Sequence, residues 1–143
     1  MTYAEQRQLA GQIMQAALRA VDPAQAVKNY FERNPNLAAK IQATPGRVIV
    51  VGAGKAGAPM AAAVAEIFGD KISAGHVVVK YGHLNPNSQF AVHNPQFTII
   101  EAGHPVPDEA GLAAAREIVG LVSDTTPDDI VLCLISGGGS ALL

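Results

Sequence analysis

The chain has 143 residues, of which 49% are hydrophobic, 15% charged and 5% aromatic, and it contains one cysteine. Ten basic residues against twelve acidic ones give a formal net charge of −2, a balance that argues against a nucleic-acid binder or a polybasic membrane binder. The length fits one domain with a sizeable core. A single cysteine excludes an internal disulfide framework and fits the reducing cytoplasm.

Neither a membrane span nor a secretory leader is expected. The longest uncharged apolar stretch, residues 130–143, includes three consecutive glycines and is shorter than the roughly 18 residues that a span requires. The amino terminus lacks both the basic start and the apolar core of a signal peptide. We therefore expect a cytoplasmic protein.

Residues 1–46 are predicted to form an N-terminal helical segment. Apolar residues recur three and four positions apart in its first half, which is typical of an amphipathic helix. Asp22 followed by Pro23 indicates the start of a second helix, because an aspartate caps well and proline is favoured at the first helical position. We expect this helix to end in the cluster 33–36, and a turn at 44–46 to close the segment.

Residues 47–143 are predicted to form a partial Rossmann-like α/β domain. Apolar runs without polar alternation are typical of parallel strands that are buried on both faces. Between them, an Ala-rich helix to about Phe68 and a helix after Asp108 are expected. The interval 81–96 has no helical period and is interpreted as an extended crossover or a small hairpin at the sheet edge. Strands are predicted at 48–51, 76–80, 97–101 and 130–135.

The alternation of strands and helices predicts a doubly wound parallel sheet with the strand order 3-2-1-4. In such a sheet, the loops after the first and fourth strands meet at the switch point where ligands bind, about one strand spacing of ~5 Å apart.

The first of these loops carries the pattern G-x-G-x-x-G at Gly52, Gly54 and Gly57. Two glycines let the backbone turn tightly and approach a phosphate, and the third lets the following helix pack closely on the sheet. A plain tight turn that needs glycine for steric reasons is the alternative. We favour binding of a phosphate or another anion, because the pattern follows a strand and opens a helix.

A nicotinamide cofactor is disfavoured at this turn. A site for NAD needs an acidic residue about 20 residues further on, at the end of the second strand. That strand ends in Lys80, which could accept the 2′-phosphate of NADP but not the ribose hydroxyls of NAD.

Lys55 lies inside the turn and is the candidate catalytic residue. Its ammonium group is placed near any anion that the loop holds, and such a cation stabilises the charge of a transferring phosphoryl group. The Walker A pattern is not matched. A lysine that is merely solvated at a helix start is disfavoured by the helix dipole.

The loop after the fourth strand is a second candidate anion site, rich in backbone N–H groups and hydroxyls. It is not a hydrolase nucleophile elbow, because G-x-S-x-G would need glycine at Leu142. Two such loops and one lysine predict a polyphosphate or a phosphorylated ligand. The candidate residues are Ser136, Gly137, Gly138, Gly139 and Ser140.

The remaining candidates carry less weight. The four histidines, His76, His83, His93 and His104, do not have the spacing of a zinc site, and no metal-binding residue is assigned. His104 is retained as a candidate binding residue because it leaves the end of a strand between Gly103 and Pro105. Cys133 is expected to lie in the core.

Four motifs occur in the order VGAGKAG (51–57), VVVKYGH (77–83), EAGHPVPDEAG (101–111) and LISGGGSALL (134–143). In these residues the chain resembles the bacterial glycerate 2-kinases, which are often labelled hydroxypyruvate reductases of tartrate utilisation. The resemblance covers nearly the whole chain. The segment 85–96 departs from it, because it is longer than the usual link between the flanking motifs.

The resemblance implies a kinase that uses ATP and a divalent metal, Mg²⁺, to phosphorylate the 2-hydroxyl of D-glycerate. Family members are much longer, with a Rossmann-like N-terminal domain, a smaller C-terminal domain and an active site in the cleft between them. Lys55 resembles the essential lysine of the GAGKA turn, and Gly137–Ser140 resemble the loop that holds nucleotide phosphate or substrate. This chain would then be the N-terminal part, inactive without the missing C-terminal domain.

Two other functions stay open at this point, an NAD(P)H-dependent hydroxypyruvate reductase and a non-catalytic phosphate-binding or nucleotide-binding fragment. The sequence also leaves open a homo-oligomer.

Overall fold

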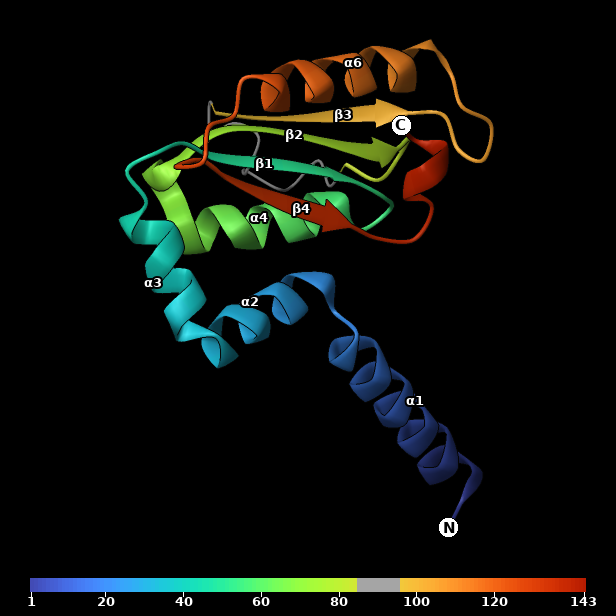
Figure 1. The fold of residues 1–143 in the computed structure, drawn as a ribbon. Helices are drawn as coiled ribbons and strands as arrows, with labels where there is room; N and C mark the ends of the chain where they lie inside the picture. The colour runs from blue at the N-terminus through green and yellow to red at the C-terminus, as the bar shows by residue number, and fades with distance from the viewer. Residues whose placement is uncertain (85–95) are drawn as a thin grey trace.

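A computed structural model describes residues 1–84 and 96–143 of the chain. Its centre is a parallel sheet of β1 (Val48–Ala53), β2 (Ile72–Lys80), β3 (Phe97–Ala102) and β4 (Ile130–Ile135). The strand order is β3-β2-β1-β4, as predicted. Helices cover both faces of the sheet, with α4 (Gly57–Phe68) on one and α6 (Glu109–Ser123) on the other (Figure 1). The predicted α/β fold class is thus confirmed.

The core is divided between the two faces of the sheet. The larger cluster lies on the side of α4 and includes Val50, Val64 and Val77, all fully buried. A smaller cluster, including Val78 and Ala114, lies on the side of α6. Because successive side chains of a strand point to opposite faces, both layers require apolar residues, which explains the unbroken apolar runs.

The second strand begins at Ile72, four residues earlier than predicted. Ser73 and Gly75 interrupt the apolar run, so hydropathy alone hides this part of the strand. Gly75 is needed there, because a Cβ at this position would lie 2.7 Å from the ring of Phe97 on β3. The expected crossover or hairpin within residues 81–96 falls largely outside the described residues.

The N-terminal segment contains α1 (Tyr3–Ala20), α2 (Pro23–Arg33) and α3 (Pro35–Ala43), one helix more than predicted. The side chain of Asp22 caps α2, as expected, by accepting a hydrogen bond from the N–H of Gln25 at 2.7 Å. The cluster 33–36 ends α2 but also starts α3, because its proline occupies the first helical position. Figure 1 shows α2 beside α4. The rings of Phe31 and Phe68 pack edge to face between these helices, with their centroids 4.9 Å apart.

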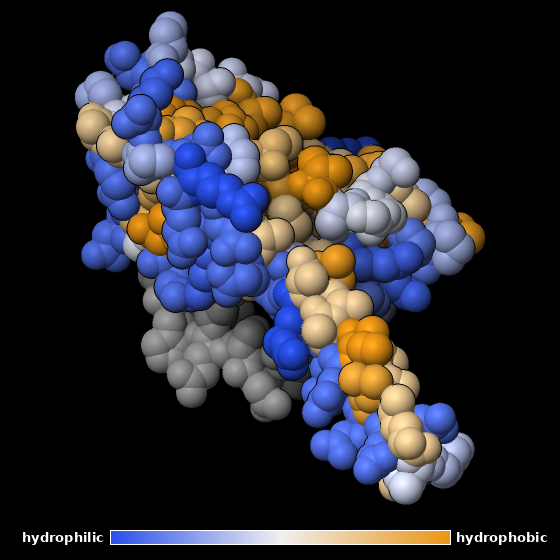
Figure 2. Space-filling model, turned by 90° about the horizontal axis from the view of Figure 1, so that it is seen from below, coloured by the Kyte–Doolittle hydropathy of each residue, from blue (hydrophilic) through white to orange (hydrophobic). Residues whose placement is uncertain are grey.

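Helix α1 projects away from the rest of the molecule (Figure 1) and contains no buried residue. Figure 2 shows its apolar side chains as a stripe along one side. The exposed members of this stripe are Leu9, Ile13, Met14 and Leu18. No helix in residues 1–84 and 96–143 is both long and apolar enough to cross a membrane.

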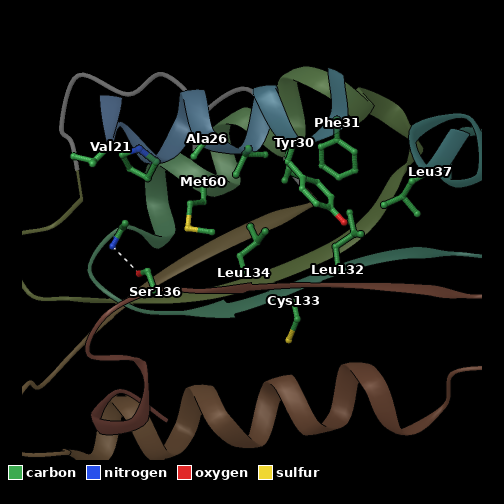
Figure 3. Close-up of a pocket in the computed structure, with 14 residues that line it drawn as sticks. Val21, Ala26, Tyr30, Phe31, Leu37, Met60, Leu132, Cys133, Leu134 and Ser136 are labelled. Carbon is green, nitrogen blue, oxygen red and sulfur yellow. Dashed lines mark hydrogen bonds between the residues drawn. The ribbon is translucent and has the colours of Figure 1, made fainter. Parts of the chain in front are cut away.

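Cys133 is exposed, and the prediction that it lies in the core is wrong. Its strand, β4, is the edge of the sheet that the described residues form, and it pairs with β1 there. Helix α6 packs mainly on the other three strands, so it leaves one face of β4 largely open within the described part of the chain. On that face the side chain of Ile135 is 61% exposed, and Figure 3 shows Cys133 pointing away from the groove between α2 and the sheet.

Candidate functional site

The three glycines of the turn between β1 and α4 each permit a close approach within the fold. A Cβ on Gly52 would lie 2.9 Å from the Cβ of Leu134 on the neighbouring strand. Gly57 lets α4 pack on β2, because a Cβ there would lie 2.7 Å from a methyl group of Val77. Gly54 has a φ of +132°, and a Cβ on it would overlap the side-chain oxygen of Ser136. The pattern therefore has a steric basis at every glycine.

Most N–H groups of this turn donate hydrogen bonds within the chain. Gly54 donates to the carbonyl of Val78 at 3.0 Å, and Gly57 donates to the carbonyl of Gly54 at 3.0 Å. Between them, the N–H groups of Lys55 and Ala56 donate to the loop after β4. Ala58 comes next, and its N–H has no acceptor among the described residues. The turn thus offers an anion fewer donors than its sequence pattern indicates.

The loops after β1 and β4 are joined directly. Lys55 N–H donates to the carbonyl of Gly137 at 3.2 Å, and Ala56 N–H donates to Oγ of Ser136 at 3.0 Å. In return, Ser136 N–H donates to the carbonyl of Ala53 at 3.1 Å. The prediction that these loops meet at the carboxyl edge of the sheet is confirmed.

The unused donors are concentrated in the loop after β4. Gly138 is left-handed, with a φ of +88°, and the short 3-10 helix η2 (Gly139–Ala141) follows it. Within the described part of the chain, the N–H groups of Gly137, Gly138 and Ser140 have no acceptor, and the Ser140 hydroxyl has no partner. Gly137 and Ser140 are exposed. This loop is therefore the better-equipped anion site of the two.

Lys55 is exposed, and its ammonium group has no carboxylate partner among the described residues. Its backbone, in contrast, is held on both sides. The N–H donates to Gly137, and the carbonyl oxygen lies 3.1 Å from Nδ1 of His83. A fixed backbone and an exposed ammonium group are properties expected of a residue that binds an anionic ligand.

His104 lies at the same edge of the sheet, beside the loop after β4. A Cβ on Gly138 would be 2.6 Å from Nε2 of His104, so the ring edge lies directly over this glycine. The peptide bond between His104 and Pro105 is cis. The structure thus brings together Lys55, His104 and both glycine-rich loops.

Two carboxylates organise the neighbouring part of this edge. Asp108 caps α6 by accepting from the N–H of Gly111 at 3.0 Å, and it also accepts from the hydroxyl of Tyr81 at 2.9 Å. The hydrogen bonds from backbone N–H groups and from Tyr81 lower the pKa of Asp108, and the same contact raises the pKa of Tyr81. Glu101 accepts from the N–H of Gly82 at 2.7 Å.

Sequence reasoning did not single out Tyr81 or His83. Their signal lies in the sequence Tyr-Gly-His directly after a buried strand, because the end of a parallel strand faces the ligand edge of the sheet. No group of three or more His, Cys, Asp or Glu that could hold a metal ion occurs in residues 1–84 and 96–143.

A groove of about 610 Å³ lies between α2 and β4 (Figure 3). Its lining is almost entirely apolar, with Tyr30, Met60 and Leu132 among its members and no Asp, Glu, Lys or Arg. Ala56 and Ser136, which are hydrogen-bonded to each other, link the groove to the joined loops. Among the described residues, the groove thus lacks the charged side chains that would hold a phosphate.

Comparison with known proteins identifies the family. The family model DUF4147, described as a domain of unknown function, matches residues 9–143. The chain belongs to this family. A D-glycerate 2-kinase from Thermotoga maritima is 43% identical over 136 residues, which are 95% of this chain and 29% of that protein. A provisionally named hydroxypyruvate reductase from Agrobacterium vitis is 44% identical over 137 residues, 96% of this chain and 28% of that protein.

The solved structures of DUF4147 relatives agree with the sequences. A crystal structure of a glycerate kinase from Thermotoga maritima superposes with a TM-score of 0.76 at 41% identity. The match covers 98% of this chain and 30% of that one. The chain thus spans about 30% of the length of these relatives. The resemblance to glycerate 2-kinases that four sequence motifs indicated is confirmed.

Proposed function

We propose that this chain is the N-terminal part of a glycerate 2-kinase, which transfers a phosphoryl group from ATP to the 2-hydroxyl of D-glycerate and gives 2-phosphoglycerate. The observation that carries the proposal is that Lys55, whose ammonium has no carboxylate partner among the described residues, is bonded through its backbone to a loop whose N–H donors are unused there. The DUF4147 relatives that are named glycerate 2-kinases support the reaction.

In this proposal, the loop after β4 holds the anion. The N–H groups of Gly137, Gly138 and Ser140 and the Ser140 hydroxyl are the donors for phosphate or carboxylate oxygens, because they have no acceptor in the described chain. Ser136 and Gly139 shape this loop, since a Cβ on Gly139 would lie 3.0 Å from the carbonyl of Ala53.

Lys55 is the proposed catalytic residue. Its ammonium group stabilises the negative charge of the transferring phosphoryl group, which ATP supplies when it is bound. Gly52, Gly54 and Gly57 contribute by placing Lys55 against the loop after β4 rather than by donating to the anion themselves. His104, which lies over Gly138, is proposed to contact the ligand held there.

We assign no residue of this chain to Mg²⁺. The described residues lack a group of three or more His, Cys, Asp or Glu, so the phosphate oxygens and water are the proposed ligands of the ion. No step of the reaction is attributed to a protein-held metal.

The proposed enzyme is cytoplasmic and is completed by a C-terminal domain. Because the relatives are longer, we propose that residues 1–46 and 47–143 form a helical segment and a partial Rossmann-like domain of a two-domain protein. The 143-residue chain alone is then expected to lack activity.

A hydroxypyruvate reductase is the second candidate, because relatives from Agrobacterium vitis carry that provisional name. Two features weigh against it. Strand β2 ends in Lys80 rather than an acidic residue, and most N–H groups of the turn after β1 are bonded within the chain.

Product identity tests the proposal. The protein encoded by the complete gene is incubated with ATP, Mg²⁺ and D-glycerate, and the product is passed to enolase, which dehydrates 2-phosphoglycerate but not the 3-isomer. Formation of phosphoenolpyruvate supports the kinase. Oxidation of NADH or NADPH by hydroxypyruvate, without enolase-dependent product, would instead support the reductase. The third hypothesis, a non-catalytic binding module, predicts that neither activity is found. It also predicts that isothermal titration of the 143-residue chain with ATP gives a heat of binding.

A further inference from the structure

We propose that His83 is a positioning residue, which holds the backbone of Lys55 so that the lysine side chain is oriented for catalysis. The inference rests on the proposed function, since it gives a role to a side chain that is hydrogen-bonded to the backbone of the proposed catalytic lysine. It adds a residue from the β2 side of the ligand edge to a site otherwise built from the loops after β1 and β4.

The first support is how the backbone of Lys55 is held. Its N–H donates to the carbonyl of Gly137 at 3.2 Å, so the loop after β4 fixes one side. Its carbonyl oxygen faces Nδ1 of His83 at 3.1 Å, so His83 fixes the other. Without His83, the carbonyl side of Lys55 would have no side-chain partner in the described chain.

The second support is how firmly His83 itself is anchored. Its N–H donates to the carbonyl of Lys80 at 3.0 Å, which closes a turn. Glu101 accepts from the N–H of the preceding Gly82 at 2.7 Å, and Tyr81 is bonded to Asp108 at 2.9 Å. The turn is therefore tied to the end of β3 and to the start of α6. Because this turn is bonded to two regular elements, the His83 side chain can orient Lys55, the residue to which it is hydrogen-bonded.

The contact also fixes the chemistry of the imidazole ring. A carbonyl oxygen only accepts, so Nδ1 of His83 must carry the proton and donate it to Lys55. The amide of asparagine can present an N–H near the position of Nδ1, whereas alanine presents none. His83→Asn should thus keep the function that His83→Ala loses.

The decisive experiment compares steady-state kinetics of the complete gene product and its variants. We expect His83→Ala to lower kcat for D-glycerate phosphorylation by about 10- to 100-fold, because small misplacements of a reacting group have effects of this size. The KM for ATP should stay within about twofold, and His83→Asn should regain most of kcat. In a Lys55→Ala background, His83→Ala should cause less than about a twofold further loss, because its effect passes through Lys55.

The matched control is His76→Ala. His76 lies on β2, the strand that precedes the turn with His83, and its Nδ1 is 3.2 Å from the carboxylate of Glu117 on α6 rather than near Lys55. A loss of stability without a loss of kcat is expected for this variant. The proposal is overturned if His83→Ala retains normal kcat, if Asn does not rescue a folded protein, or if the losses from Lys55→Ala and His83→Ala are additive.

A second measurement needs no activity. Selective ¹⁵N labelling of histidine reports the tautomer, and the Nδ1-protonated form is expected for His83 in the complete protein. If the wild-type enzyme does not phosphorylate glycerate but His83 shows this tautomer, the proposed function fails and the contact survives. If His83 instead carries its proton on Nε2, the proposed hydrogen bond to the carbonyl of Lys55 is wrong, even if the enzyme is active.

Discussion

Replacing Gly54 by alanine is predicted to destabilise the fold strongly. The position has a φ of +132°, and the added Cβ would overlap Oγ of Ser136 and lie 2.6 Å from the carbonyl oxygen of that residue. Backbone strain of this kind costs about 1–3 kcal/mol, and overpacking costs about as much again. Displacement of Ser136 would also break its hydrogen bond from Ala56, a loss of roughly 1 kcal/mol.

Together these effects predict a loss of roughly 3–7 kcal/mol in the free energy of unfolding, a large part of the ~5–15 kcal/mol typical of a domain. Urea unfolding of the 143-residue chain, followed by circular dichroism, measures it as a lower midpoint. Gly120→Ala is the matched control, because no described residue outside the local backbone of α6 lies within 4 Å of the new Cβ. It should stabilise the chain by about 0.5–1 kcal/mol. A Gly54→Ala variant within about 1 kcal/mol of wild type would refute the reasoning.

Three further predictions concern separate parts of the chain. Lys55→Met should lower the kcat of the complete gene product for D-glycerate phosphorylation by about 100- to 1000-fold. Its melting temperature should be retained because the side chain is exposed, and a turnover near normal would remove Lys55 from the mechanism. Hydrogen bonds from Arg47 and from backbone N–H groups hold the pKa of Asp129 well below its ordinary 3.8. The ionised Asp129 therefore stabilises the fold above pH 3.8, and this stabilisation is lost as the pH falls toward the pKa of the folded state. The melting temperatures of wild type and Asp129→Asn should therefore converge as the pH drops below about 3.8. A constant difference between the two melting temperatures across that range would contradict this role of Asp129. Cys133 should react rapidly with a maleimide in the 143-residue chain. If the rest of the proposed longer protein completes the partial Rossmann-like sheet beside β4, the reaction should be slow in the complete gene product, and rapid reaction in both would argue against that completion.

The sheet was predictable because its signals are local. The unbroken apolar run 48–51 followed by glycine and a helix indicates a buried parallel strand wherever the rest of the chain lies. The strand order followed from the doubly wound rule once four strands were counted. Helix α3 was missed because Pro35 ends one helix and starts the next, and a proline carries both meanings.

The state of the site was less predictable because its contacts are distant in sequence. The pattern of Gly52, Gly54 and Gly57 indicates a turn with open N–H groups, but whether they stay open depends on what packs against them. Here the loop after β4 takes the N–H groups of Lys55 and Ala56. Likewise, the composition of β4 indicates burial, whereas the exposure of Cys133 depends on what lies beside the edge strand.

Release of ADP tests the central claim most directly. The complete gene product, its Lys55→Met variant and the 143-residue chain are each given ATP and Mg²⁺, with and without D-glycerate. We predict ADP release that depends on glycerate from the wild-type complete protein alone. Absence of glycerate-dependent ADP from that protein, with folding verified, would contradict the assignment of this DUF4147 chain to a glycerate kinase.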